Sequence, residues 1–208
     1  MDGTLTETNE LIFATFNHIA EKYVGRRFTS AEITAMFGPP EEIAIERLVG
    51  DGRLSLAMAD FFDFYRRNFH LRAKLHPGMD EILGFLKERK LFLAVFTGKG
   101  TRSTEITLQE LGVRHYFDMI VTGNDVVNHK PSSEGIRKVM DRFKLSHDEV
   151  LMIGDAVADV KASHEAGIPI AAVVWDSYAK DKVMQMDTDY LFHDVAELRE
   201  WLEKILRP

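Results

Sequence analysis

Residues 150–159 read Val-Leu-Met-Ile-Gly-Asp-Ala-Val-Ala-Asp, and this stretch decides the fold. Its first four residues are apolar, which is typical of a strand buried on both faces of a parallel sheet. A helix is predicted over 157–166, where Gly167 ends it, and a second apolar strand is predicted over 170–174. A strand, a helix and a strand in this order predict a parallel sheet with crossover connections.

The same alternation extends in both directions from this stretch. Upstream and downstream, further elements are predicted as helices over 78–89, 102–111 and 132–144, strands over 91–96, 119–121 and near 190–191, and a last helix from about residue 195. A capping-box pattern at Ser146–Glu149 leads into the strand at 150. This part of the chain is therefore expected to be an α/β fold with a Rossmann-like parallel sheet.

The first third of the chain has a different pattern, with helical periodicity alone. Its expected elements are helices over 9–24, 40–49 and 54–70, a capping box at Thr29–Glu32 and a turn at 50–52. The predicted organisation is an α/β core formed by residues 1–9 and 76–208, interrupted by an all-helical cap over 10–75.

Composition excludes several classes of protein. The 208 residues carry a net charge of −7, which argues against a nucleic-acid binder. No Cys is present, so disulfides, thiolate metal sites and Cys nucleophiles are excluded, and a reducing compartment fits. No apolar run approaches the roughly 18 residues that a membrane span needs. The first residues do not resemble a signal peptide. We therefore expect a cytoplasmic protein with no membrane or nucleic-acid partner.

Polar residues follow the carboxyl ends of the predicted strands, where ligands of open α/β sheets bind. They are Thr97, Gly98 and Lys99 after 91–96, Lys130 after 119–121, and Asp155 and Asp159 after 150–153. The two aspartates are spaced i,i+4, so their charges repel on one helical face. Solvation or a nearby lysine could offset this repulsion, and so could Mg²⁺, which prefers carboxylate and phosphate oxygens.

These residues together resemble the motifs of the haloacid dehalogenase (HAD) superfamily of phosphatases and phosphomutases. Met1-Asp2-Gly3-Thr4 matches all but the first residue of the Asp-x-Asp-Gly-Thr motif. Thr97-Gly98, Lys130-Pro131 and Gly154-Asp155-x-x-x-Asp159 match the next three motifs in order. The helical segment after the first motif resembles the cap of the subfamily that contains phosphoglycolate phosphatase, pyrophosphatases and β-phosphoglucomutase.

The resemblance implies the chemistry and the role of each residue. Mg²⁺ would be held by Asp155, by the backbone carbonyl of Asp2 and by a carboxylate nucleophile, with Asp159 orienting the metal's waters or Lys130. Thr97, Gly98 and Lys130 would bind phosphate oxygens. Asp2 would act as general acid and then as general base. The expected substrate is a small phosphorylated metabolite, with a phosphoglycolate-like monoester as the best single candidate.

In the family, the nucleophilic Asp lies two residues before the general acid, at the end of the first strand of the sheet. This sequence starts one residue before Asp2, so we expect that strand and its nucleophile to lie upstream of Met1. A β-phosphoglucomutase-like phosphomutase is the alternative enzyme. If the natural chain starts at Met1, a catalytically inactive binding domain is the third interpretation.

Several other residues have two interpretations each. Lys99 could bind a substrate anion or be a surface lysine, and Gly38-Pro39-Pro40 could face the site or be a helix-to-helix turn. Trp175 could line the pocket or pack in the core. Glu7 and Thr8 could contact substrate, or simply begin a helix. The sequence is compatible with a monomer or a homodimer.

Overall fold

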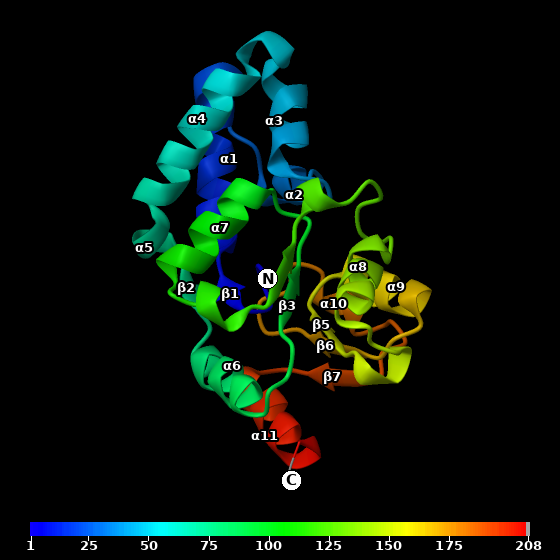
Figure 1. Cartoon of the computed structure of the whole chain (residues 1–208). Helices are drawn as coiled ribbons and strands as arrows, with labels where there is room; N and C mark the ends of the chain where they lie inside the picture. The colour runs from blue at the N-terminus through cyan, green and yellow to red at the C-terminus, as the bar shows by residue number, and fades with distance from the viewer. Residues whose placement is uncertain (207–208) are drawn as a thin grey trace.

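The computed structural model describes residues 1–206, and its elements run from a group of helices into alternating strands and helices (Figure 1). The helices of the first part are α1 (Asn9–Tyr23), α2 (Ser30–Thr34), α3 (Glu41–Val49), α4 (Asp51–Arg67) and α5 (Phe69–Arg72). They pack around a hydrophobic core in which Phe16, Phe61 and Tyr65 are buried, and Ile106 from the second part of the chain also belongs to it. The Thr29 capping box at the start of α2 is confirmed, with Glu32 N donating to Thr29 Oγ1 at 3.2 Å.

Two very short strands join this helical group to the rest of the chain. Strand β1 (Thr6–Glu7) leads into α1, and β2 (Lys74–Leu75) follows α5. They pair antiparallel, with Thr6 opposite Leu75 and Glu7 opposite Lys74. Both connections of the helical group therefore lie side by side.

The expected α/β fold with parallel strands is confirmed in the second part. Its elements are α6 (Met79–Glu88), β3 (Ala94–Phe96), α7 (Thr101–Glu110), β4 (Met119–Val121), α8 (Glu134–Phe143), β5 (Met152–Gly154), α9 (Val157–Ala166), β6 (Ile170–Val173), α10 (Lys180–Val183), β7 (Tyr190–Phe192) and α11 (Val195–Ile205). Strand β3 pairs with β4, and β5, β6 and β7 pair in that order, all in parallel. The strand at 119–121 and the helix at 157–166 lie where the sequence predicts them.

Helices cover both faces of these strands. Residues of α8 and α9 pack with Phe96 and Val121 on one face. Residues of α6 and α11 pack with Val95 and Val173 on the other face. The strand ends that carry the polar residues are thereby held between two packed layers.

The strands form two separate sheets, because no ladder joins β3 to β5. A cavity of about 230 Å³ lies between them, lined by β3, β5 and apolar side chains of α6 and α8. Its walls include Val95, Ile153, Ile82 and Ile136, and Met1 also lines it. The facing edges of β3 and β5 are therefore separated by an apolar space.

Two sequence expectations are wrong in detail. Residues 50–52 are not a turn, because Gly50 alone makes the break at φ 77° and α4 begins at Asp51, whose carboxylate suits a helix N-terminus. The strand predicted from residue 91 begins only at Ala94. Before it, Leu93 N donates to the side chain of Asp118 instead of to a neighbouring strand, and Phe92 is 56% exposed.

No helix within residues 1–206 combines the length and the apolar composition needed to cross a membrane.

Candidate active site

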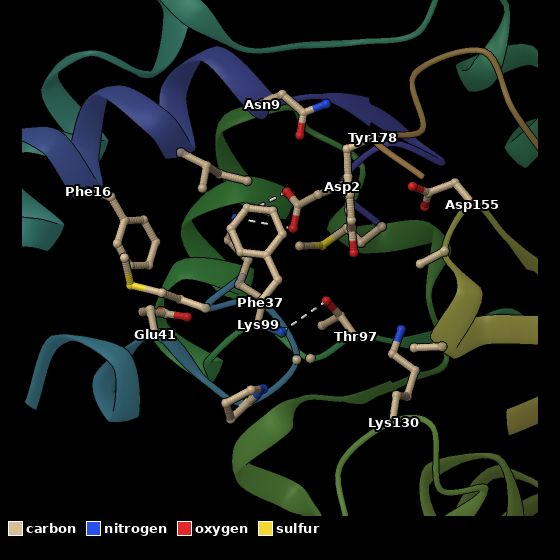
Figure 2. A pocket seen from close by; sticks show the side chains of 18 of the residues that line it. Asp2, Asn9, Phe16, Phe37, Glu41, Thr97, Lys99, Lys130, Asp155 and Tyr178 are labelled. Carbon is tan, nitrogen blue, oxygen red and sulfur yellow. Dashed lines mark hydrogen bonds and ion pairs between the residues drawn. The ribbon is translucent and has the colours of Figure 1, made fainter. Parts of the chain in front are cut away.

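The polar residues that follow separate strands meet in one cavity of about 150 Å³ between the helical group and the α/β part (Figure 2). Loops after β3 and β5 bring Thr97 and Asp155 to the cavity, the segment before α8 brings Lys130, and the N-terminal loop brings Asp2. Every site residue predicted from the sequence lines this cavity: Asp2, Thr97, Gly98, Lys99, Lys130, Asp155 and Asp159.

Asp155 is held against the N-terminal loop. It is 4% exposed, and Thr4 Oγ1 donates to its Oδ1 at 2.6 Å. A Cβ on Gly3 would lie 2.4 Å from Asp155 Oδ2, and Gly3 has a φ of 76°, so only glycine fits there. Burial and then the charge of Asp159 raise the pKa of Asp155 to about 7. The positive charge of Lys130 acts in the opposite direction but does not offset these two effects.

Asp159 has a different environment although it is four residues away. Its Oδ1 lies 2.7 Å from Lys130 Nζ, and its Oδ2 accepts from the backbone N–H groups of Asp155 and Ala156. Burial favours a raised pKa for Asp159, but the Lys130 ammonium and the hydrogen bonds to the carboxylate together outweigh it, and the pKa lies below the usual value. The repulsion expected for this i,i+4 pair is thus offset for Asp159 by a lysine.

Lys130 is placed between a sheet end and this carboxylate. Its Nζ also donates to the carbonyl of Phe96 at 3.3 Å and lies 5.0 Å from the centre of the Phe96 ring. The ammonium is therefore fixed at the end of β3, close to Thr97. A phosphate oxygen placed there would meet both a fixed positive charge and a hydroxyl donor.

Asp2 is fixed by a lysine and a threonine. Lys99 Nζ lies 3.1 and 3.3 Å from its two carboxylate oxygens, and Thr8 Oγ1 donates to Oδ1 at 2.7 Å. Burial alone would raise the pKa of Asp2, but the positive charges, Lys99 foremost, and the hydrogen bonds from Thr8 and Lys99 together lower it. Lys99 is not a surface lysine: its side chain is 8% exposed and its Nζ lies 4.8 Å from the centre of the Tyr65 ring.

The loop at 38–40 faces the cavity. Gly38 and Pro39 line it, and a Cβ on Gly98 would lie 2.3 Å from the Gly38 carbonyl oxygen. Beside this contact, the Phe37 and Tyr178 rings meet edge to face at 5.5 Å. The loop at 38–40 therefore forms part of the cavity wall, and Figure 2 shows the neighbouring Phe37 side chain beside that of Tyr178.

Other candidates lie outside the cavity lining. Trp175 packs against His76, with ring centres 5.9 Å apart, and joins a core cluster. Glu7 pairs with Lys74 at 3.1 Å, and Thr8 contacts the cavity only through Asp2.

Sequence reasoning did not assign several lining residues from distant parts of the chain to the site, among them Asn9, Glu41 and Tyr178. Asn9 Nδ2 donates to the carbonyl of Asp176 at 3.3 Å, which links α1 to the loop after β6. No motif marks these residues; only the Gly-Pro-Pro loop that precedes Glu41 signals its position.

The donor set fits Mg²⁺ in its chemistry. Asp155 supplies a buried carboxylate with a raised pKa, and the Asp2 backbone supplies a carbonyl in the same cavity. Within residues 1–206, no three His, Asp or Glu side chains are grouped as a metal site. Such a site suits an ion that takes one or two carboxylates and completes its shell with waters and phosphate oxygens, as Mg²⁺ does.

Comparisons with known proteins agree with this architecture. The haloacid dehalogenase-like hydrolase family matches residues 1–173. "Pyrophosphatase PpaX" of Halalkalibacterium halodurans is 29% identical over 202 residues, covering 95% of this chain and 92% of the relative. A Thermotoga maritima structure proposed to be a beta-phosphoglucomutase is 27% identical with a TM-score of 0.76, covering 99% and 97% of the two chains. A Haemophilus somnus structure inferred to be a phosphoglycolate phosphatase has a TM-score of 0.81 at 20% identity, covering 97% and 94%.

Proposed function

The chain belongs to the haloacid dehalogenase-like hydrolase family, and from this premise we propose that it is a Mg²⁺-dependent phosphatase of small phosphorylated metabolites. The observation that carries the proposal is the meeting of Asp2, Thr97, Lys130 and Asp155 in one cavity at the strand ends. Phosphoryl transfer needs positioning and charge neutralisation above all, and this arrangement offers both.

The phosphate-binding half of the site consists of Thr97, Gly98 and Lys130. The Thr97 hydroxyl and the Gly98 N–H are donors at the end of β3, and Lys130 adds a positive charge fixed by Asp159. Donors that are held before the substrate binds do not need to reorganise during the reaction. In this proposal Asp159 is a positioning residue that acts through Lys130.

Asp2 is the proposed proton carrier. Protonated, it would donate to the leaving oxygen, and ionised, it would accept a proton from the attacking water. Thr8 and Lys99 hold its carboxylate in one orientation. Mg²⁺ bound by Asp155 and the Asp2 carbonyl would neutralise phosphate charge.

The cavity between β3 and β5 is the place where a strand carrying the nucleophile would fit. An extended apolar segment that leads into Met1 would fill this cavity and pair with both open strand edges. Its end would emerge beside Asp155 and Lys130. We propose that the natural protein has such a strand, with a nucleophilic Asp two residues before Asp2, and that this carboxylate forms an aspartyl-phosphate.

A phosphomutase of the β-phosphoglucomutase type is the second candidate. The Thermotoga maritima relative, which covers 99% of this chain, favours it. The same residues would serve both reactions, since a mutase also forms a phosphoaspartate but returns the phosphoryl group to a sugar. The two candidates differ in the group that accepts the phosphoryl from the enzyme.

The test is release of inorganic phosphate, with Mg²⁺ or EDTA, from pyrophosphate, phosphoglycolate and glucose 1-phosphate. It uses both the 208-residue chain and the chain extended upstream by a strand that ends in the Asp. We expect Mg²⁺-dependent release by the extended chain. Isomerisation of the sugar phosphate without phosphate release would identify the mutase, and no turnover of any substrate would overturn both proposals in favour of a binding domain.

A further inference from the structure

The cavity has a second half, beyond the phosphate-binding residues, that must hold whatever the phosphate is attached to. The helical group supplies its walls, and they are largely apolar: Ile12, Phe16, Met36, Phe37 and Phe61. The polar exceptions on this side are Asn9, Glu41 and the Tyr65 hydroxyl. The Tyr65 hydroxyl is already paired with Thr107 Oγ1 at 2.9 Å.

Glu41 is a carboxylate fixed in this half of the cavity. It is 7% exposed, and it starts α3 directly after the loop at 38–40. Gly100 N donates to its Oε2 at 2.8 Å, and the Ser103 hydroxyl donates to its Oε1. These donors come from the α/β part, so Glu41 crosses from the helical group to the opposite wall and its charge cannot turn away.

The positive charges of the cavity are already committed. Among the residues that the structure describes, the lining contains two lysines and no arginine. Lys130 is paired with Asp159, and Lys99 is paired with both oxygens of Asp2. Burial lowers the pKa of Lys99, but negative charges around it, Asp2 foremost and Glu41 among them, raise it above its usual value. Glu41 therefore also acts electrostatically on Lys99.

An anionic leaving group would therefore be buried without a counter-charge and beside a like charge. Burying a charge without a partner is unfavourable, and juxtaposed like charges add to the cost. A neutral alcohol meets neither penalty, and its carbon atoms would pack on the apolar wall.

We propose that Glu41 selects phosphomonoesters whose leaving group carries no negative charge, and that it excludes pyrophosphate and phosphorylated carboxylic acids. This proposal rests on the proposed phosphatase function and narrows its substrate class. The small cavity agrees with a leaving group of the size of glycolate, but the charge of Glu41 is opposed to a carboxylate on it. A small polyol or sugar monoester satisfies both conditions.

The test is a binding measurement, so that it does not depend on turnover. Isothermal titration calorimetry on the 208-residue chain with Mg²⁺ compares inorganic phosphate, glycerol 3-phosphate and phosphoglycolate. We expect glycerol 3-phosphate to bind about ten-fold more tightly than phosphoglycolate, because only the second ligand brings a second anion to Glu41.

The variant Glu41→Gln removes the charge and keeps the shape of the side chain. We expect it to improve phosphoglycolate binding about ten-fold relative to glycerol 3-phosphate. The matched control is Glu46→Gln, an exposed charge on the same helix, which should change either affinity by less than about three-fold.

Equal binding of the two ligands by the unaltered protein, or no binding of either, would overturn the proposal. An unchanged ligand ratio in folded Glu41→Gln would also overturn it. Should that variant fail to fold, the ranking in the unaltered protein still decides the matter. Failure of the phosphatase proposal is a separate result, seen as absent phosphate release from every ester.

Discussion

At the scale of single residues, Asp155 and Asp159 are only four positions apart at the start of α9, but their electrostatic environments are opposite. Asp159 is satisfied inside the protein by Lys130 and two backbone N–H groups. Within residues 1–206, the Asp155 carboxylate accepts a hydrogen bond only from the Thr4 hydroxyl, and its pKa is raised to about 7 by burial and by Asp159. Asp159 is therefore satisfied by contacts within the protein, and Asp155 is the carboxylate available to bind a cation.

The first prediction is that Asp155→Asn removes Mg²⁺-dependent turnover by the extended chain. The amide has the same shape but no charge, and we expect a loss on the order of 10²–10³-fold because metal charge stabilisation of the transition state is lost. Phosphate release measured against Mg²⁺ concentration tests this. Asp141→Asn, at an exposed position on α8, is the control. Turnover close to normal in Asp155→Asn would refute the metal assignment.

Residue-scale chemistry was predictable from the sequence only where it follows a strand end. Thr97, Lys130 and Asp155 could be placed because each comes after an apolar run. The ion pair between Lys99 and Asp2 could not, since the two residues are 97 positions apart and nothing in either segment marks the other. Glu41 was missed for the same reason, because its partners lie on α7 and on the loop before it.

At the scale of elements, the paired strands β1 and β2 carry both connections to the helical group, and a buried histidine lies beside them. His76 follows β2 and is 6% exposed, with Nδ1 3.5 Å from Glu7 Oε1. Its Nε2, Trp175 Nε1 and Asp176 Oδ2 are buried without a hydrogen-bond partner. Burial lowers the pKa of His76, against the opposing charges of Asp176 and Glu7, while Lys74 adds to the lowering.

The second prediction follows from this lowered pKa. The folded protein favours neutral His76, while the unfolded chain takes up a proton below about pH 6.5, so stability should fall as pH drops below that value. We expect the melting temperature of His76→Phe to depend less on pH than that of the unaltered protein between about pH 7.5 and 5.5. His115→Gln, an exposed control, should keep the original dependence. Identical pH profiles for His76→Phe and the unaltered protein would contradict the prediction.

The third prediction concerns the cavity between β3 and β5. An upstream segment of about five β-branched apolar residues should bury several side chains there, each worth about 1.5–3 kcal/mol at most. We expect a rise in melting temperature of at least about 5 °C over a chain carrying a Gly/Ser segment of equal length. Differential scanning calorimetry makes the comparison. Equal melting temperatures would mean that the cavity does not accept a strand.

Elements with strong periodicity were predictable, and the shortest ones were not. The helix at 157–166 and the strand at 119–121 agree with the structure because apolar runs and a terminal glycine mark them. Strands β1 and β2 have two residues each, too few for any period to appear. The separation of β3 from β5 is a tertiary property that no local pattern in either strand marks.

At the scale of the whole molecule, the helical group and the α/β part meet across the site at very few backbone points. The Gly38 carbonyl oxygen lies against Gly98, so no side chain fits at position 98. The Phe37 ring meets Tyr178, and Glu41 accepts from Gly100. Asp2 and Lys99 line the same cavity as Phe37, Gly38 and Pro39, so the loop at 38–40 forms one wall of the site. The division of the chain into a cap over residues 10–75 and a core remains a prediction. The contact between Gly38 and Gly98 is a feature of the structure itself.

The fourth prediction tests the contact between the loop at 38–40 and Gly98. In Gly98→Ala, the new methyl would lie 2.3 Å from a backbone oxygen, which cannot rotate away as a side chain could, so the 38–40 loop must move outward. Displacing a site wall by even an ångström can cost about 10²-fold in rate, and we expect kcat/KM of the extended chain to fall by about that factor. Limited proteolysis should show faster cleavage within 36–40. Gly52→Ala, where an added Cβ meets nothing within 4 Å, should change neither measurement. If Gly98→Ala kept full activity and the original cleavage rate, the arrangement with the 38–40 loop against Gly98 would not be the one in which the protein works.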